Sequence, residues 1–169
     1  MNAAAKLADL TDTLDMMPEE SGAWLDCQTG RVVVVEDAVI QAVESVEGDA
    51  APEGVADWQE EQLPAARGIV EGDARYLALP DKFEFHEYRQ MERFIGTITD
   101  TRAADELWRA IKGKGAFRYF KDTADRLGLR DAWFAYRDEA AKRFMLDWAA
   151  ANDVPVDETP GRAGLASGE

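Results

Sequence analysis

The stretch "GAWLDCQTGRVVVVED", residues 22 to 37, contains the clearest β-hairpin in this chain of 169 residues. Two runs rich in apolar and β-branched side chains flank the short segment "DCQTG", and such runs predict paired strands. Gly30 ends that segment, where a short hairpin loop needs the left-handed backbone that glycine adopts without strain. The hairpin 22–35 is therefore the predicted centre of a small antiparallel sheet.

A third strand is predicted near residues 75–79, in the segment "RYLALP" that ends at Pro80. An isolated hairpin is marginally stable in water, so a third strand here helps to complete the sheet.

Short helices and one loop surround these strands. Residues 5–15 and 37–46 carry apolar side chains at helical spacing. Residues 47–57 combine glycine, proline and acidic residues and predict a loop. A further helix is predicted from residue 57, with Asp57 as N-cap and Pro64 as the point where it kinks or restarts.

After Pro80 the pattern predicts four helices, at about 82–98, 102–112, 116–127 and 132–151. Gly113 and Gly128 are natural C-terminal stops, and Asp131 is a natural N-cap for the last helix. Aromatic residues at helical spacing are expected in the core. They are Phe85, Tyr88, Trp108, Phe117, Phe120, Trp133, Tyr136, Phe144 and Trp148.

The predicted fold class is therefore α+β, a small antiparallel sheet with a C-terminal bundle of about four helices. We expect one domain over residues 1–152, with an acidic half, 1–80, and a helical half, 81–152. Residues 153–169 show no periodicity and are expected to form a disordered tail.

Charge and composition restrict the function classes. The formal net charge of −15 repels nucleic acids and anionic membranes on average. No apolar run approaches the roughly 18 residues of a membrane span. The single cysteine, Cys27, excludes an internal disulfide and, together with the absence of a signal peptide, favours a cytoplasmic location.

The charge is unevenly distributed. Residues 102 to 143 contain 11 basic and 7 acidic side chains, while the rest of the chain contains 8 basic and 27 acidic ones. This asymmetry is compatible with acidic loops around a neutral helical bundle, or with a basic docking face on an acidic body.

The segment "GKGAFRYFKD", residues 113–122, is the candidate binding site. Its glycines permit a tight reversal between two helices, and the amides that begin the second helix have no intrahelical partner. Such amides favour an anion, with help from nearby cations. The predicted site residues are Lys112, Lys114, Gly115, Arg118 and Lys121. The alternative is a purely structural corner whose arginine bonds an internal carboxylate.

The sequence gives little support for other kinds of binding or catalytic site. The segment lacks the long glycine loop and the Ser or Thr of a phosphate-binding P-loop, and the order of its aromatic and small residues differs from that of RNA-recognition domains. His86 is the only histidine, and we interpret it as a surface residue. We expect no catalytic residues, metal or cofactor.

Three segments resemble the UPF0158 family of uncharacterised bacterial proteins. They are "WLDCQTGRVVVV", "RYLALPDKFEFHEYRQMERFI" and the long stretch from "AIKGKGAFRYFKD" to "MLDWAAAND". The resemblance spans roughly residues 7–152, with Tyr119 at a position where family members often carry arginine. It implies a compact bacterial domain, and it implies no activity.

The favoured function is a non-catalytic interaction or regulatory module, in which the basic corner docks an acidic or phosphorylated protein. One alternative is a nucleic-acid-associated protein that uses the same patch, although the net charge opposes it. The other is a small enzyme with an unrecognised site. The oligomeric state is left open.

Overall fold

The computed structural model describes residues 2–48 and 50–159. The chain divides into two compact units. The first, called here the sheet unit, comprises residues 1–81 and 145–169, and the second, the helical unit, comprises residues 82–144. The division into an acidic half, 1–80, and a helical half, 81–152, stays a prediction, and the return of the chain to the sheet unit at Met145 was not predicted. That residues 1–152 act as one domain stays a prediction.

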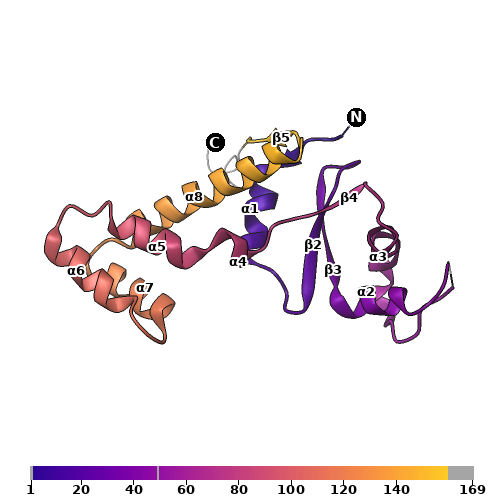
Figure 1. Cartoon of the computed structure of the whole chain (residues 1–169), viewed down its shortest axis with the longest axis horizontal. Helices are drawn as coiled ribbons and strands as arrows, with labels where there is room; N and C mark the ends of the chain where they lie inside the picture. Colours follow the sequence, from indigo (N-terminus) through magenta and orange to yellow (C-terminus); the bar gives the residue numbers. More distant parts are fainter. Residues whose placement is uncertain (1, 49, 160–169) are drawn as a thin grey trace, which may run out of the picture. The chain divides into compact units, whose positions relative to one another are not determined.

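The sheet unit contains a three-stranded antiparallel sheet, as predicted (Figure 1). Its strands are β2 (Ser21–Asp26), β3 (Arg31–Glu36) and β4 (Tyr76–Ala78), in the order β3-β2-β4. In the hairpin Trp24 pairs with Val33 and Asp26 with Arg31. Trp24 also pairs with Ala78 of β4, so the third strand covers the free edge of β2. The α+β fold class is confirmed.

Gly30 closes the hairpin under two constraints. Its φ angle is +75°, in the left-handed region, and its N–H donates to the carbonyl of Asp26 at 2.8 Å. A Cβ atom at this position would lie 2.2 Å from the carbonyl oxygen of Ala4. Glycine is needed here both for the turn and for the close approach of the N-terminal segment.

We expect Gly30→Ala to lower the free energy of unfolding by at least about 2 kcal/mol, because the backbone strain and the contact with Ala4 act together. Gly54 provides a matched control, since its φ is +82° but nothing lies within 4 Å of a Cβ there. Urea titrations of the two variants test this. A midpoint for Gly30→Ala equal to that of Gly54→Ala would show that the contact with Ala4 is unimportant.

Three α-helices and a 3₁₀-helix complete most of the sheet unit. They are α1 (Leu7–Asp15), α2 (Asp37–Glu44), η1 (Asp57–Gln62) and α3 (Leu63–Val70). Val35 of β3, Val39 and Val43 of α2, and Ala65 and Ala66 of α3 form a buried cluster where α2 and α3 pack on the sheet.

The start of the η1–α3 segment differs from the prediction. Ala56, not Asp57, is the N-cap, and its N–H donates to the side-chain oxygen of Gln59 at 2.9 Å. Pro64 lies at the start of α3, where its missing N–H costs nothing, so the predicted restart is confirmed.

A short parallel pair joins the two ends of the described chain. β1 (Ala5–Lys6) pairs with β5 (Val156–Asp157), and the N–H of Ala5 donates to the carbonyl of Pro155 at 2.9 Å. Val154 is buried. The expectation of a disordered tail was therefore wrong for residues 153–159, because a two-residue strand held by backbone hydrogen bonds needs no periodic pattern. Residues 160–169 lie outside the described residues.

The helical unit contains α4 (Lys82–Phe85), α5 (Glu87–Ile95), α6 (Thr101–Ala110), α7 (Ala116–Arg126) and the first part of α8 (Arg130–Ala151). The predicted helix over residues 82–98 is interrupted at His86, which has a left-handed backbone with φ of +61°. Helix α8 begins at Arg130, so Asp131 lies in its first turn and does not cap it.

Aromatic rings occupy the centre of the helical unit. Phe120 of α7 is fully buried, with its ring centroid 4.9 Å from that of Trp133 and 6.2 Å from that of Phe94. The predicted core position of Phe117 was wrong, because its side chain is 45% exposed. The buried cluster consists of Met91, Phe94, Ile95, Leu107, Ile111, Phe120, Ala124 and Trp133.

Candidate anion-binding corner

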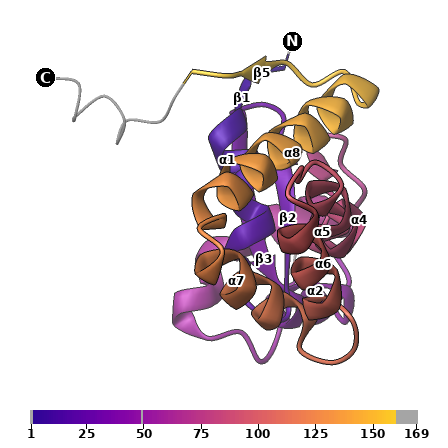
Figure 2. The ribbon, with the colours of Figure 1, turned by 90° about the vertical axis from the view of Figure 1, so that its left-hand side faces the viewer.

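The five residues Ile111–Gly115 connect α6 to α7, which lie side by side (Figure 2). Ile111 is buried, and its carbonyl accepts a hydrogen bond from the Tyr88 hydroxyl at 3.1 Å, which fixes the start of the loop. Gly113 and Gly115 then adopt φ angles of +86° and +76°. Two left-handed residues in a short loop reverse the chain, as the sequence predicted, and leave the intervening Lys114 exposed.

Gly115 also makes room for a ring. It is the N-cap of α7, and its carbonyl accepts the N–H of Tyr119 at 3.0 Å. A Cβ at residue 115 would lie 3.1 Å from the Tyr119 ring, so the ring covers the bare glycine backbone. The Tyr119 side chain nevertheless remains 56% exposed.

The first turn of α7 has an unusual electrostatic character. The N–H groups that begin a helix have no intrahelical acceptor, and together they place a partial positive charge there. Most helices offset this charge with an acidic residue or a capping side chain, but α7 has no acidic residue in its first turn and no side-chain cap. Lys114 precedes that turn and Arg118 lies in it. Cations thus gather where the helix dipole disfavours them.

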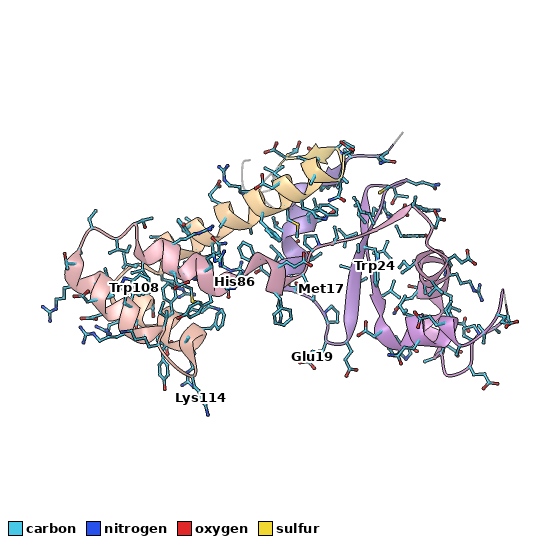
Figure 3. The ribbon with its side chains drawn as sticks, in the orientation of Figure 1. Met17, Glu19, Trp24, His86, Trp108 and Lys114 are labelled. Atoms are coloured by element: carbon cyan, nitrogen blue, oxygen red, sulfur yellow. The ribbon has the colours of Figure 1, made fainter. Side chains whose placement is uncertain are left out.

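The predicted basic side chains are all exposed to solvent, and Lys114 projects away from both helices (Figure 3). Arg118 Nε lies 4.0 Å from the Asp122 carboxylate, and both side chains are largely exposed, so this pair neutralises little charge. Lys112, Lys114 and Lys121 make no ion pair with any carboxylate among residues 2–48 and 50–159. The structure thus places Lys112, Lys114 and Arg118 at the loop end of the α6–α7 hairpin, whereas Lys121 lies in the middle of α7; the four are called here the basic corner.

Some other cations of the helical unit are paired. Arg126 of α7 donates to Glu106 of α6 at 2.6 Å, and Arg102 lies 3.9 Å from the same carboxylate. The bond from Arg126 holds the pKa of Glu106 below its usual value. Arg137 of α8 pairs with Glu87 of α5. The three lysines of the basic corner differ from these arginines in having no carboxylate partner within the described ranges.

Exposed aromatic side chains near the basic corner were missed by the sequence reasoning. Phe117 and Tyr119 lie in the first turns of α7, and Trp108 of α6 is also partly exposed. Helical spacing assigned Phe117 to the core together with Phe120. No spacing signal separates them, because Phe117 lies three residues before Phe120 and continues the stripe of Phe120, Ala124 and Leu127.

The remaining candidate groups, His86 and Cys27, form no metal-ligand cluster in the described residues. His86 is exposed, and no group of three or more potential metal ligands occurs in the described part of the chain. Cys27 is buried directly after β2, and this burial, with help from the charge of Asp26, raises the pKa of its thiol. A raised pKa keeps the thiol protonated and unreactive.

Comparison with known proteins gives one result. The family described as "Uncharacterised protein family (UPF0158)" matches residues 54–159. The chain belongs to this family. The region shared with UPF0158 includes β4, the helical unit, the basic corner and β5, whereas the hairpin precedes it. No curated protein and no solved structure matches the chain significantly.

No helix in the described ranges, 2–48 and 50–159, has the length and apolar character required to cross a membrane.

Proposed function

We propose that this UPF0158 protein is a non-catalytic interaction module whose basic corner docks an acidic or phosphorylated segment of a partner protein. The observation that carries the proposal is the accumulation of exposed cations at the uncapped first turn of α7. Because these charges repel both the helix dipole and one another, their arrangement costs free energy in the free protein. A bound anion would offset that cost.

The corner supplies two kinds of anion ligand. The N–H groups that begin α7 point along the helix axis, as in other phosphate sites at helix ends. Lys114 and Arg118 add charge-assisted hydrogen bonds from either side of Gly115. Carboxylate and phosphate oxygens both accept from such donors.

The surroundings favour a protein partner over nucleic acid. Phe117 and Tyr119 offer apolar surface beside the cations, which suits the side chains that flank an acidic residue in a peptide. The rest of the surface would repel a long polyanion, because the protein has a net charge of −15. A short acidic segment avoids that repulsion.

The double variant Lys114→Ala/Arg118→Ala tests the proposal. We expect it to bind a fluorescein-labelled peptide of alternating phosphoserine and glutamate about tenfold more weakly, since each lost exposed ion pair is worth up to about 1 kcal/mol. Its melting temperature should be unchanged or slightly raised, because the variant relieves repulsion at the helix start. Fluorescence anisotropy and thermal unfolding measure the two effects.

Arg89→Ala/Arg93→Ala is the matched control, because both arginines are exposed on α5 and the change in net charge is the same. It should retain peptide binding. A lowered melting temperature with unchanged binding in the Lys114→Ala/Arg118→Ala variant would instead favour a purely structural corner. Tighter binding of single-stranded DNA or RNA than of the peptide, at equal salt, would favour the nucleic-acid alternative.

A further inference from the structure

A hollow of about 270 Å³ lies in the helical unit between α7 and the beginning of α8. This volume is close to the lower limit of small-molecule sites, roughly 300 Å³. It therefore suits a small metabolite and not a peptide. The residues that line it are Lys121, Asp122, Ala124, Asp125, Arg130, Trp133 and Phe134.

Trp133 is the first indication of a ligand. Its side chain is 1% exposed and lines the hollow, yet its indole Nε1 has no hydrogen-bond partner among the described residues. Buried polar groups in folded proteins nearly always have a partner, and a donor left without one is unfavourable. The Nε1 atom is also shielded from solvent, so an acceptor on a bound molecule would satisfy this N–H only with a shift of the indole ring.

The charges of the hollow are the second indication. It presents two cations, Lys121 and Arg130, and two carboxylates, Asp122 and Asp125. Lys121 and Asp125 lie four residues apart on α7, a spacing that commonly forms ion pairs, yet neither pairs with any residue in the described ranges. Both signs of charge are therefore available to a ligand.

One wall of the hollow is aromatic. Phe134 is 45% exposed, and the Arg130 guanidinium lies 5.6 Å from the centroid of its ring. This contact holds the guanidinium at the rim and offers apolar surface next to it. The hollow thus combines a positive group, a negative group, a buried donor and an apolar wall.

We propose that this hollow binds a free α-amino acid with an apolar side chain. The ligand carboxylate accepts from the lining cations and, once the indole ring shifts, from Trp133 Nε1, while the ammonium donates to the lining carboxylates and the side chain packs against Phe134. A simple anion would leave the two aspartates facing it, and a simple cation would leave Arg130 and Lys121 unmatched. A zwitterion pairs with the cations and with the carboxylates of the hollow at the same time.

The experiment is an NMR titration of the isotope-labelled full chain with L-phenylalanine as probe. The indole N–H signal of Trp133, assigned by its loss in Trp133→Phe, should shift and saturate. Arg130→Gln and Asp125→Asn should each weaken binding about tenfold, because each removes one charge-assisted interaction. Arg143→Gln and Asp131→Asn change exposed residues of α8 that do not line the hollow, and should leave binding unchanged.

Two derivatives of the probe test the contributions of its carboxylate and its ammonium group separately. L-phenylalaninamide lacks the carboxylate and N-acetyl-L-phenylalanine lacks the ammonium, so both should bind at least tenfold more weakly than L-phenylalanine. Equal binding of either derivative, no saturable shift, or an affinity insensitive to Arg130→Gln would overturn the proposal. Lys114→Ala/Arg118→Ala should retain amino-acid binding, so failure of the docking proposal and failure of this one are distinguishable.

Discussion

Phe120→Ala should destabilise the helical unit by about 3–5 kcal/mol, the range found when large aromatic side chains are removed from a protein core. The Phe120 ring is fully buried and contacts Trp133 and Phe94 in edge-to-face geometry. Its removal leaves a cavity within the buried cluster that α5, α6, α7 and α8 share. Urea unfolding monitored by circular dichroism measures the effect.

Phe117→Ala is the control for this experiment. It removes the same side chain three residues earlier on α7, but this ring is 45% exposed. We expect a change within about 0.5 kcal/mol, as for other surface substitutions. Similar losses for both variants would mean that the face of α7 described here as exposed is buried in solution.

The second large effect is expected at Asp26, in the sheet unit. Its carboxylate is buried and accepts two hydrogen bonds from Arg75, one from Nε and one from Nη2, each at 2.8 Å. The N–H of Gln28 also donates to it, at 3.0 Å. These hydrogen bonds, chiefly those from Arg75, lower the pKa of Asp26 from 3.8 to about 2.

Asp26→Asn should lower the free energy of unfolding at neutral pH by roughly 2 kcal/mol, because one pKa unit corresponds to about 1.4 kcal/mol. Asp147→Asn, an exposed position on α8 with the same change in charge, should have little effect. Urea titrations at neutral pH compare the two. A stability of Asp26→Asn equal to that of Asp147→Asn would show that the pair with Arg75 contributes nothing.

The lowered pKa of Asp26 also predicts a pH dependence. The unfolded chain binds the proton more readily than the folded protein, so this contribution is complete above about pH 4 and disappears as the pH falls toward 2. Over that window the unfolding free energy of the unchanged protein should fall more steeply than that of Asp26→Asn. Parallel curves would contradict the assignment.

The structural features predicted correctly from the sequence are those that local interactions determine. The hairpin around Gly30 and the reversal at Gly113 and Gly115 follow from side-chain alternation and from glycines that the turns require. The helices after Pro80 follow from apolar periodicity, apart from the interruption at His86.

Contacts between distant residues were beyond local reasoning. Asp26 and Arg75 lie 49 residues apart, and β1 and β5 come from opposite ends of the described chain. The exposure of Phe117 and the hollow beside Trp133 depend on how helices pack, which spacing along one helix does not determine. The cations of the basic corner were predicted as a group, because three of them fall on neighbouring turns of one helix and loop. Their role as a binding site stays a proposal.

The central claim is that the first turn of α7 and its cations bind an anionic peptide. NMR titration of the isotope-labelled protein with the phosphoserine–glutamate peptide tests it most directly. We predict saturable shifts of the backbone amide signals of residues 115–118, which weaken as salt is added. If those amides stay unmoved while the peptide binds, or if no peptide binds at low salt, the claim is contradicted.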